Sequence, residues 1–219
     1  MKYNTFLFDF DGTIINSIEA IVLSVTATFE HFDFPVPEEK EIKKYIGIPL
    51  HNYFPYLAKE HYEKHKAEDV MAKYREIYET SYGRTHIKLY DGMKDLLHDL
   101  KNKGAKLGIV SSKMTAPIEM NLRDTEMDGI FDAIIGSDQV SNYKPMPETV
   151  FLCAQKIGLE DVKRALVIGD SHHDIEMGRR AGMDTCAVPW GAGTQEELGW
   201  AKPTYFPKTI DELSKLFMS

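Results

Sequence analysis

The 219-residue sequence predicts an α/β fold, a doubly wound parallel sheet with a small inserted α-helical domain. Short apolar runs such as Phe6–Phe8 alternate with helical patterns from residue 87 onward, which is typical of a parallel sheet covered on both faces. Between residues 16 and 86, apolar residues follow helical spacing and no strand is predicted. We therefore expect a core of residues 1–15 and 87–219, interrupted by a helical domain of residues 16–86.

The first predicted strand ends in two acids. Asp9 and Asp11 are two residues apart, so in an extended chain their side chains point the same way. Gly12 then allows a sharp turn and a close approach to a ligand. Paired carboxylates attract a cation, and hard oxygen ligands beside backbone amides suit Mg²⁺ and a phosphate. The alternative is an ordinary Asp-Gly turn, which does not require the second acid.

Three helices are predicted in the inserted segment. The first has apolar residues at three- and four-residue spacing, the second follows Pro37 and stops at Gly47, and the third is long and polar. Their expected ranges are 18–32, 38–46 and 63–82. A turn-rich segment, Gly47-Ile48-Pro49-Leu50-His51, separates the second helix from the third.

After the insertion, helices and strands alternate. The predicted strands cover residues 105–110, 131–135, 165–168 and 185–188, with a short one at 205–206. The predicted helices cover residues 93–103, 115–124, 147–157, 173–181 and 209–217. In such sheets, ligands bind beyond the carboxyl ends of the strands, so polar residues at those ends are candidates for the site.

Polar residues follow the later strands too. Ser111 and Ser112 come after the second core strand, and a serine hydroxyl with a backbone amide can hold a phosphate oxygen. Lys144 stands in a loop fixed by two prolines, and Asp170 ends a strand four residues before Asp174. Each has an ordinary explanation alone, as a helix cap or a solvated lysine. Together they place four acids, a hydroxyl and a lysine at one edge of the sheet.

Composition narrows the classes of partner and compartment. The net charge of −8 and the lack of a basic run argue against nucleic acid or an anionic membrane as the main partner. No apolar run reaches membrane-spanning length, and no signal peptide is predicted. Cys153 and Cys186 lie in apolar patterns, so we expect buried thiols in a reducing compartment, with a disulfide as the alternative. The expected location is the cytoplasm.

These motifs resemble the haloacid dehalogenase superfamily. Asp-x-Asp-Gly-Thr, a serine after a strand, Lys-Pro and Gly-Asp-x-x-x-Asp occur in the family's order across nearly the whole chain. The resemblance implies a Rossmann-like core and makes residues 16–86 a mobile cap. It implies that Asp9 is a nucleophile forming an aspartyl-phosphate, that Asp11 is the general acid and base, and that Lys144 orients nucleophile and phosphate. The implied phosphate-binding residues are Gly12, Ser111, Ser112 and Lys144, and the implied Mg²⁺ ligands are Asp9, Asp11, Asp170 and Asp174.

The resemblance extends to a subgroup. An acid at Asp11 favours phosphoryl transfer over dehalogenation. The Gly47–Leu50 segment is similar to phosphoglycolate phosphatases, and Gly-Asp-x-His-His-Asp-Ile is similar to bacterial pyrophosphatases. The expected activity is Mg²⁺-dependent hydrolysis of a small phosphate monoester of the phosphoglycolate kind, with Gly47 and His51 in the cap contributing to specificity. An inorganic pyrophosphatase and a sugar-phosphate mutase are the alternatives. Ser111-Ser112 departs from the more frequent Thr-Asn, and Asp91-Gly92 from Pro-Gly.

Other interpretations remain. A receiver-like phospho-switch also uses acids, a hydroxyl and a lysine on a parallel sheet, but its phosphorylated aspartate comes later and it has no inserted cap. His172 and His173 are expected near the phosphate or the metal ligands, because adjacent histidines rarely reach one ion and carboxylates favour Mg²⁺. The Trp190–Thr194 segment is a weak glycine-rich motif that does not predict a dinucleotide site. We expect a small phosphorylated metabolite as substrate and a monomer or homodimer in solution.

Overall fold

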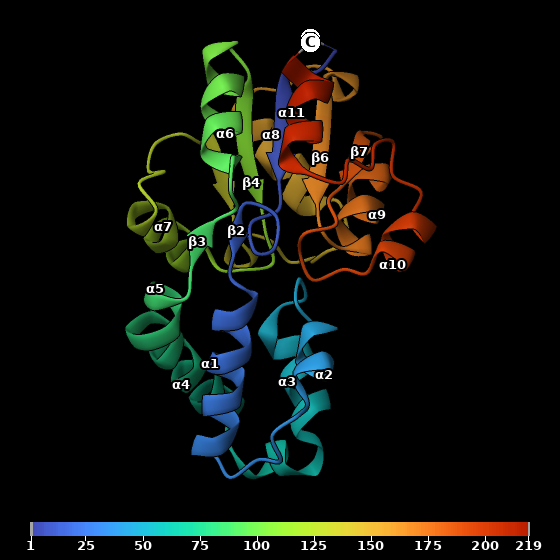
Figure 1. Cartoon of the computed structure of the whole chain (residues 1–219). Coiled ribbons are helices and arrows are strands. Elements are labelled where there is room, and N and C mark those ends of the chain that lie inside the picture. Colours follow the sequence, from blue (N-terminus) through green and yellow to red (C-terminus); the bar gives the residue numbers. More distant parts are fainter. Residues whose placement is uncertain (1, 219) are drawn as a thin grey trace.

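The computed structural model describes residues 2–218 and is built on a five-stranded parallel sheet with the order β5-β4-β1-β6-β7 (Figure 1). Strand β1 (Thr5–Phe8) lies in the middle, hydrogen-bonded to β4 (Lys106–Val110) and β6 (Ala165–Gly169). The edge strands are β5 (Ala133–Ile135) and β7 (Asp184–Ala187). The α/β fold with a doubly wound parallel sheet, predicted from the alternating pattern, is confirmed.

Alternate residues of the central strand face opposite sides of the sheet. Phe6 and Phe8 belong to an apolar cluster on one face, while Leu7 belongs to a second cluster on the other. The helices packed in the first cluster are α6 (Met93–Asn102), α7 (Thr115–Asp124) and α11 (Ile210–Met218). Those packed in the second are α8 (Glu148–Ile157) and α9 (His172–Arg180). Because β1 is covered on both sides, its sequence is continuously apolar.

The chain leaves and re-enters the core through a short antiparallel pair, β2 (Ile15–Asn16) and β3 (Lys88–Leu89). Sequence periodicity does not detect strands of two residues. Between them a helical layer lies beyond the carboxyl end of the sheet, at the bottom of Figure 1. Its α-helices are α1 (Ile18–His31), α2 (Glu39–Lys43), α3 (Leu50–Ala58), α4 (Ala67–Ile77) and α5 (Gly83–Thr85). They share an apolar cluster of their own, which includes Phe29, Phe54 and Val70.

Two predictions within this helical layer are wrong. Only the start of the segment 47–51 is a turn, because helix α3 begins at Leu50, directly after Pro49. The single helix predicted over residues 63–82 is divided into a 3₁₀ helix η1 (Lys59–Lys64), α4 and a π-helical turn η2 (Tyr78–Tyr82). The apolar stripe was identified correctly over α4. The breaks arise because the chain bends to keep both Tyr62 and Tyr78 in the cluster of the layer.

The core contains one helix that was not predicted, α10 (Gln195–Trp200). Its signal is a capping box, in which Thr194 and Glu197 exchange side-chain and backbone hydrogen bonds. The short strand expected at residues 205–206 is a single bridge between Tyr205 and Cys186. Two further 3₁₀ helices, η3 (Ser137–Gln139) and η4 (Val162–Arg164), complete the described elements.

Both cysteines are free and buried, as expected for structural thiols. Burial raises the pKa of the Cys153 thiol to about 12 and that of Cys186 further, so neither is a reactive thiolate at neutral pH. Within residues 2–218, none of the helices combines the length and the apolar composition that crossing a bilayer requires.

Candidate active site

Three neighbouring strands bring the predicted site residues to one edge of the sheet. Asp9 follows β1 and its amide donates to the carbonyl of Ile168 in β6, at 2.8 Å. Ser111 follows β4, and Asp170 follows β6. The residues predicted from the strand ends therefore come together because their strands are adjacent in the sheet.

Asp9, Asp170 and Asp174 form a compact group of acids, with one carboxylate oxygen of each within 4.8 Å of the others. All three are buried, with exposed fractions of 3%, 3% and 0%. Burial raises the pKa of Asp170 well above its usual range, and the charges of Asp9 and Asp174 add to this effect. Burial also raises the pKa of Asp9 to about 7, against the opposing charge of Lys144. Three crowded acids with oxygen donors suit a divalent cation such as Mg²⁺.

Lys144 bridges two of these acids. Its Nζ lies 2.7 Å from Oδ1 of Asp9 and 2.6 Å from Oδ1 of Asp174, and its side chain is 2% exposed. Burial alone would lower the pKa of Lys144, but Asp174 and Asp9 outweigh burial and raise it. The lysine therefore remains charged and fixes the orientation of Asp9.

The remaining oxygens of the acids are held by their surroundings. Oδ2 of Asp174 accepts from the amide and hydroxyl of Ser171, at 3.0 and 2.6 Å, in a capping box at the start of α9. Asp170 accepts from the Thr13 hydroxyl at 3.0 Å and from the Ala192 amide at 2.7 Å. These hydrogen bonds fix the carboxylates in place, which is what a rigid metal site requires.

Glycines allow the backbone to approach Asp170. Gly12 has φ +79°, and a Cβ placed there, or at Gly191 or Gly193, would overlap Asp170. The glycine-rich segment 190–194 thus closes over an acid of the site. Its composition, which was not assigned a function from the sequence, reflects this close contact.

Asp11 lies outside the three-acid group, although the sequence suggested it as a fourth metal ligand. Its Oδ1 instead accepts from Nζ of Lys113, at 2.9 Å, and the same Nζ donates to the Tyr78 hydroxyl at 2.6 Å. Burial lowers the pKa of Lys113, and the neighbouring Asp11 opposes this shift. Lys113 had no predicted role, although its position two residues after Ser111, at a strand end, was a usable signal.

The two serines differ in their partners. Ser111 Oγ accepts from the Lys113 amide at 3.2 Å. Ser112 Oγ is buried and has no hydrogen-bond partner among the described residues. A hydroxyl in this position can bind an oxygen of a ligand.

A cavity of about 130 Å³ separates the sheet edge from the helical layer, and Asp9 and Asp11 line it together with Ser111 and Ser112. From the helical layer, Gly47 and His51 also line it. Gly47 has φ +95°, and the His51 ring lies 5.2 Å from that of Tyr143, next to Lys144. The residues expected to contribute to specificity therefore lie at the same cavity as the acids.

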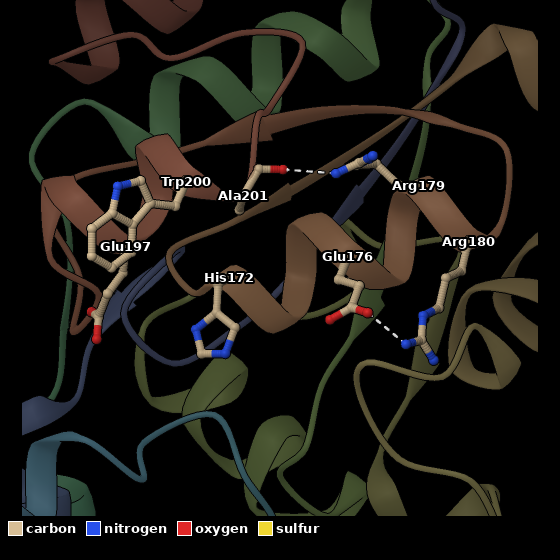
Figure 2. A pocket seen from close by; sticks show the side chains of 7 residues that line it. All are labelled: His172, Glu176, Arg179, Arg180, Glu197, Trp200 and Ala201. Atoms are coloured by element: carbon tan, nitrogen blue, oxygen red, sulfur yellow. Dashed lines mark hydrogen bonds and ion pairs between the residues drawn. The ribbon is translucent and has the colours of Figure 1, made fainter.

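Two other hollows lie away from the acids. His172 and His173, whose rings are 3.8 Å apart, line a hollow of about 340 Å³ together with three lysines of the α2 region. An open hollow of about 620 Å³ lies between α9 and α10 (Figure 2). Its two arginines are already engaged, Arg179 with the Ala201 carbonyl and Arg180 with Glu176. None of the three grouped acids lines either hollow.

Comparison with known families agrees with this geometry. Residues 6–188 match the model of the haloacid dehalogenase-like hydrolases, which spans the sheet, the insertion and all the site residues above. The chain belongs to the haloacid dehalogenase-like hydrolase family. The family resemblance inferred from the four motifs is thereby confirmed, and the chain is a hydrolase and a phosphatase of this family.

Individual relatives are similar over the full length. Pyrophosphatase PpaX of Bacillus cereus (strain AH820) is 33% identical over 217 residues, which are 99% of this chain and 95% of the relative. A predicted phosphatase from Clostridium acetobutylicum has a TM-score of 0.85 at 28% identity, covering 100% of this chain and 99% of the other. A predicted phosphoglycolate phosphatase from Haemophilus somnus has a TM-score of 0.85 at 25% identity, covering 99% and 98%. Haloacid dehalogenase-like hydrolases with these names therefore share the whole architecture, including the helical insertion.

Proposed function

We propose that this phosphatase hydrolyses a small phosphate monoester or anhydride, with Mg²⁺, through an aspartyl-phosphate on Asp9. The observation that carries the proposal is the contact of Lys144 with Asp9 beside two further buried acids. Lys144 holds an Asp9 oxygen and neutralises charge next to it, so that an anionic phosphoryl group can approach a carboxylate. Phosphoryl transfer depends mainly on such positioning and charge stabilisation.

The residues divide the reaction into two steps. An Asp9 oxygen attacks phosphorus, the bond to the leaving oxygen breaks, and Asp11 donates a proton to that oxygen. Water then attacks the phosphorus of the aspartyl-phosphate, Asp11 takes the proton of the water, and phosphate departs while Asp9 is restored. Splitting the reaction through a covalent intermediate replaces one slow step with two easier ones. Gly12, Ser111 and Ser112 are the proposed donors to the phosphoryl oxygens.

The metal assignment follows the chemistry of the donors. Asp9, Asp170 and Asp174 offer three buried carboxylate oxygens, the ligand type that Mg²⁺ prefers. Phosphatases of this family generally use Mg²⁺. Bound Mg²⁺ would offset the charge that gathers on the phosphoryl oxygens. Asp11, paired with Lys113, is assigned to proton transfer and not to metal binding through its side chain.

Two substrate classes have specific support. The Gly47–Leu50 segment and neighbours such as the predicted phosphoglycolate phosphatase from Haemophilus somnus favour a phosphoglycolate-like ester. The 33% identity to Pyrophosphatase PpaX over nearly the full chain favours inorganic pyrophosphate. Both are small and anionic, and a cavity of about 130 Å³ suits a small leaving group. A sugar-phosphate mutase has no comparable support.

We assign residues 16–86 as a cap domain that closes over the core, residues 1–15 and 87–219. The separate apolar cluster of the insertion and its two connections at β2 and β3 support this division. Closure of such a domain excludes water from the first step. A cytoplasmic location agrees with the two free, buried cysteines, and fractionation of cells would test it. Sedimentation would distinguish the expected monomer from a homodimer.

The test is a hydrolysis screen with Mg²⁺ over phosphoglycolate, pyrophosphate and sugar phosphates. We expect phosphate release that EDTA abolishes and added Mg²⁺ restores. Full activity in metal-free buffer would contradict the metal assignment. Formation of an isomeric sugar phosphate without phosphate release would indicate a mutase, and phosphorylation without turnover would indicate a switch.

A further inference from the structure

Helix α4 presents one face to the active-site cavity. Met71, Tyr74, Arg75 and Tyr78 are spaced three, four and seven residues apart, and all four line the cavity. Asp9 and Asp11 line it from the core. In an in-line transfer, the leaving group points away from the attacking Asp9 oxygen. The face of α4 is therefore where the leaving group of a bound substrate would lie.

This face carries donors without partners. Arg75 makes no hydrogen bond or ion pair with any residue that the structure describes. The hydroxyls of Tyr53 and Tyr74 likewise have no hydrogen bond within residues 2–218, although their side chains are only 2% and 6% exposed. From the core side, Ser112 Oγ adds a buried hydroxyl without a partner. Buried polar groups normally have partners, so these four await oxygen atoms of a ligand.

The charge state of these groups makes them donors at neutral pH. Burial raises the pKa of Tyr53 and Tyr74, and the nearby charge of Asp11 adds to both shifts, so the phenols stay protonated. Arginine is charged at any physiological pH and offers a planar pair of donors that matches a carboxylate or phosphate. A neutral hydrocarbon leaving group would leave this set unpaired, which a binding site penalises strongly.

We propose that Arg75, Tyr53 and Tyr74 form a subsite for a leaving group that carries its own anionic oxygens, as a carboxylate or a second phosphoryl group. The inference rests on the proposed phosphatase function and adds the residues that select the substrate. The cavity of about 130 Å³ is only a few times the roughly 30 Å³ that one water occupies in the liquid. The subsite therefore suits a leaving group of a few non-hydrogen atoms, of the size of glycolate or phosphate.

The experiment compares three substrates: 2-phosphoglycolate, pyrophosphate and 2-hydroxyethyl phosphate, whose leaving group is neutral. The kcat/KM of each is measured with Mg²⁺ for the wild type and for Arg75→Gln, Tyr53→Phe and Tyr74→Phe. Arg164→Gln is the matched control, because Arg164 is exposed and lies outside the cavity. Circular dichroism and thermal melting establish that each variant is folded.

We expect Arg75→Gln to lower the kcat/KM ratio of an anionic to the neutral substrate by about tenfold or more, the usual effect of losing a charged hydrogen bond. Each tyrosine variant should lower it by about threefold. The arm that falls identifies the anion, a carboxylate with phosphoglycolate or a phosphoryl group with pyrophosphate. An equal loss on all three substrates, or a ratio that changes as little as in Arg164→Gln, would overturn the subsite. If the wild type hydrolyses none of the three, the phosphatase proposal itself fails and the subsite with it.

Discussion

Nζ of Lys113 lies 2.9 Å from Oδ1 of Asp11, and both side chains are nearly buried, with exposed fractions of 10% and 12%. The same Nζ donates to the hydroxyl of Tyr78, which belongs to the π-helical turn that ends the inserted helices. That hydroxyl donates in turn to Asn121 of core helix α7, at 3.1 Å. A residue of the proposed cap thus orients the proposed general acid through one lysine. π-Helical turns are frequent at functional sites.

This chain of contacts predicts the behaviour of Tyr78→Phe. Without the hydroxyl, Lys113 loses one of its two partners and Asp11 is held less firmly. Alkyl phosphates need a proton on the leaving oxygen, whereas p-nitrophenyl phosphate hardly does, so we expect the alkyl ester to lose about tenfold more kcat. Tyr62→Phe, in the same apolar cluster but outside the cavity, is the control. Equal losses with both esters would show that Tyr78 acts only on stability.

The strand ends explain how much of the site the sequence could predict. Asp9, Ser111 and Asp170 follow strands that are strongly apolar and pair side by side, so their convergence follows from topology alone. The contact of Lys113 with Asp11 could not be predicted, because it depends on the insertion packing Tyr78 beside the sheet. Pairing of strands as short as β2 and β3 depends likewise on the assembled fold and leaves no periodic signal.

Asp9→Asn is expected to abolish turnover and retain the fold. An amide cannot form the aspartyl-phosphate, but it has the shape of the carboxylate and can still accept from Lys144. Because burial raises the pKa of Asp9, removing its charge relieves repulsion, and the metal-free variant should melt no lower than the wild type. The stabilisation that Mg²⁺ gives the wild type should shrink in the variant. Beryllofluoride should bind Asp9 as a phosphoryl mimic, and an adduct located on another residue would refute the assignment.

Asp184 predicts a pH dependence of stability. It accepts from Lys2 at 2.8 Å and from the buried Tyr3 hydroxyl at 2.6 Å, and these hydrogen bonds lower its pKa in the folded state. A depressed acid contributes stability above its unfolded pKa of about 3.9, and this contribution is lost as the pH falls through the folded value. Asp184→Asn should therefore melt below the wild type at pH 5 to 7. The difference should shrink below about pH 4, and melting curves at each pH measure it.

The loop from Gly47 to His51 provides a test of specificity. Gly47 has φ +95°, a conformation that a β-branched side chain adopts only with strain, and a Cβ there would lie 3.7 Å from the Ser171 hydroxyl. Gly47→Val should therefore displace the loop against the core, and His51→Ala removes the ring that packs on Tyr143 beside Lys144. Because both residues line the cavity and neither contacts Asp9, these variants should change the ratio of kcat/KM between two phosphorylated metabolites while hydrolysis of p-nitrophenyl phosphate persists. A uniform fall across all substrates would mean that the loop governs closure or stability, since only an altered ratio reports a contact with the leaving group.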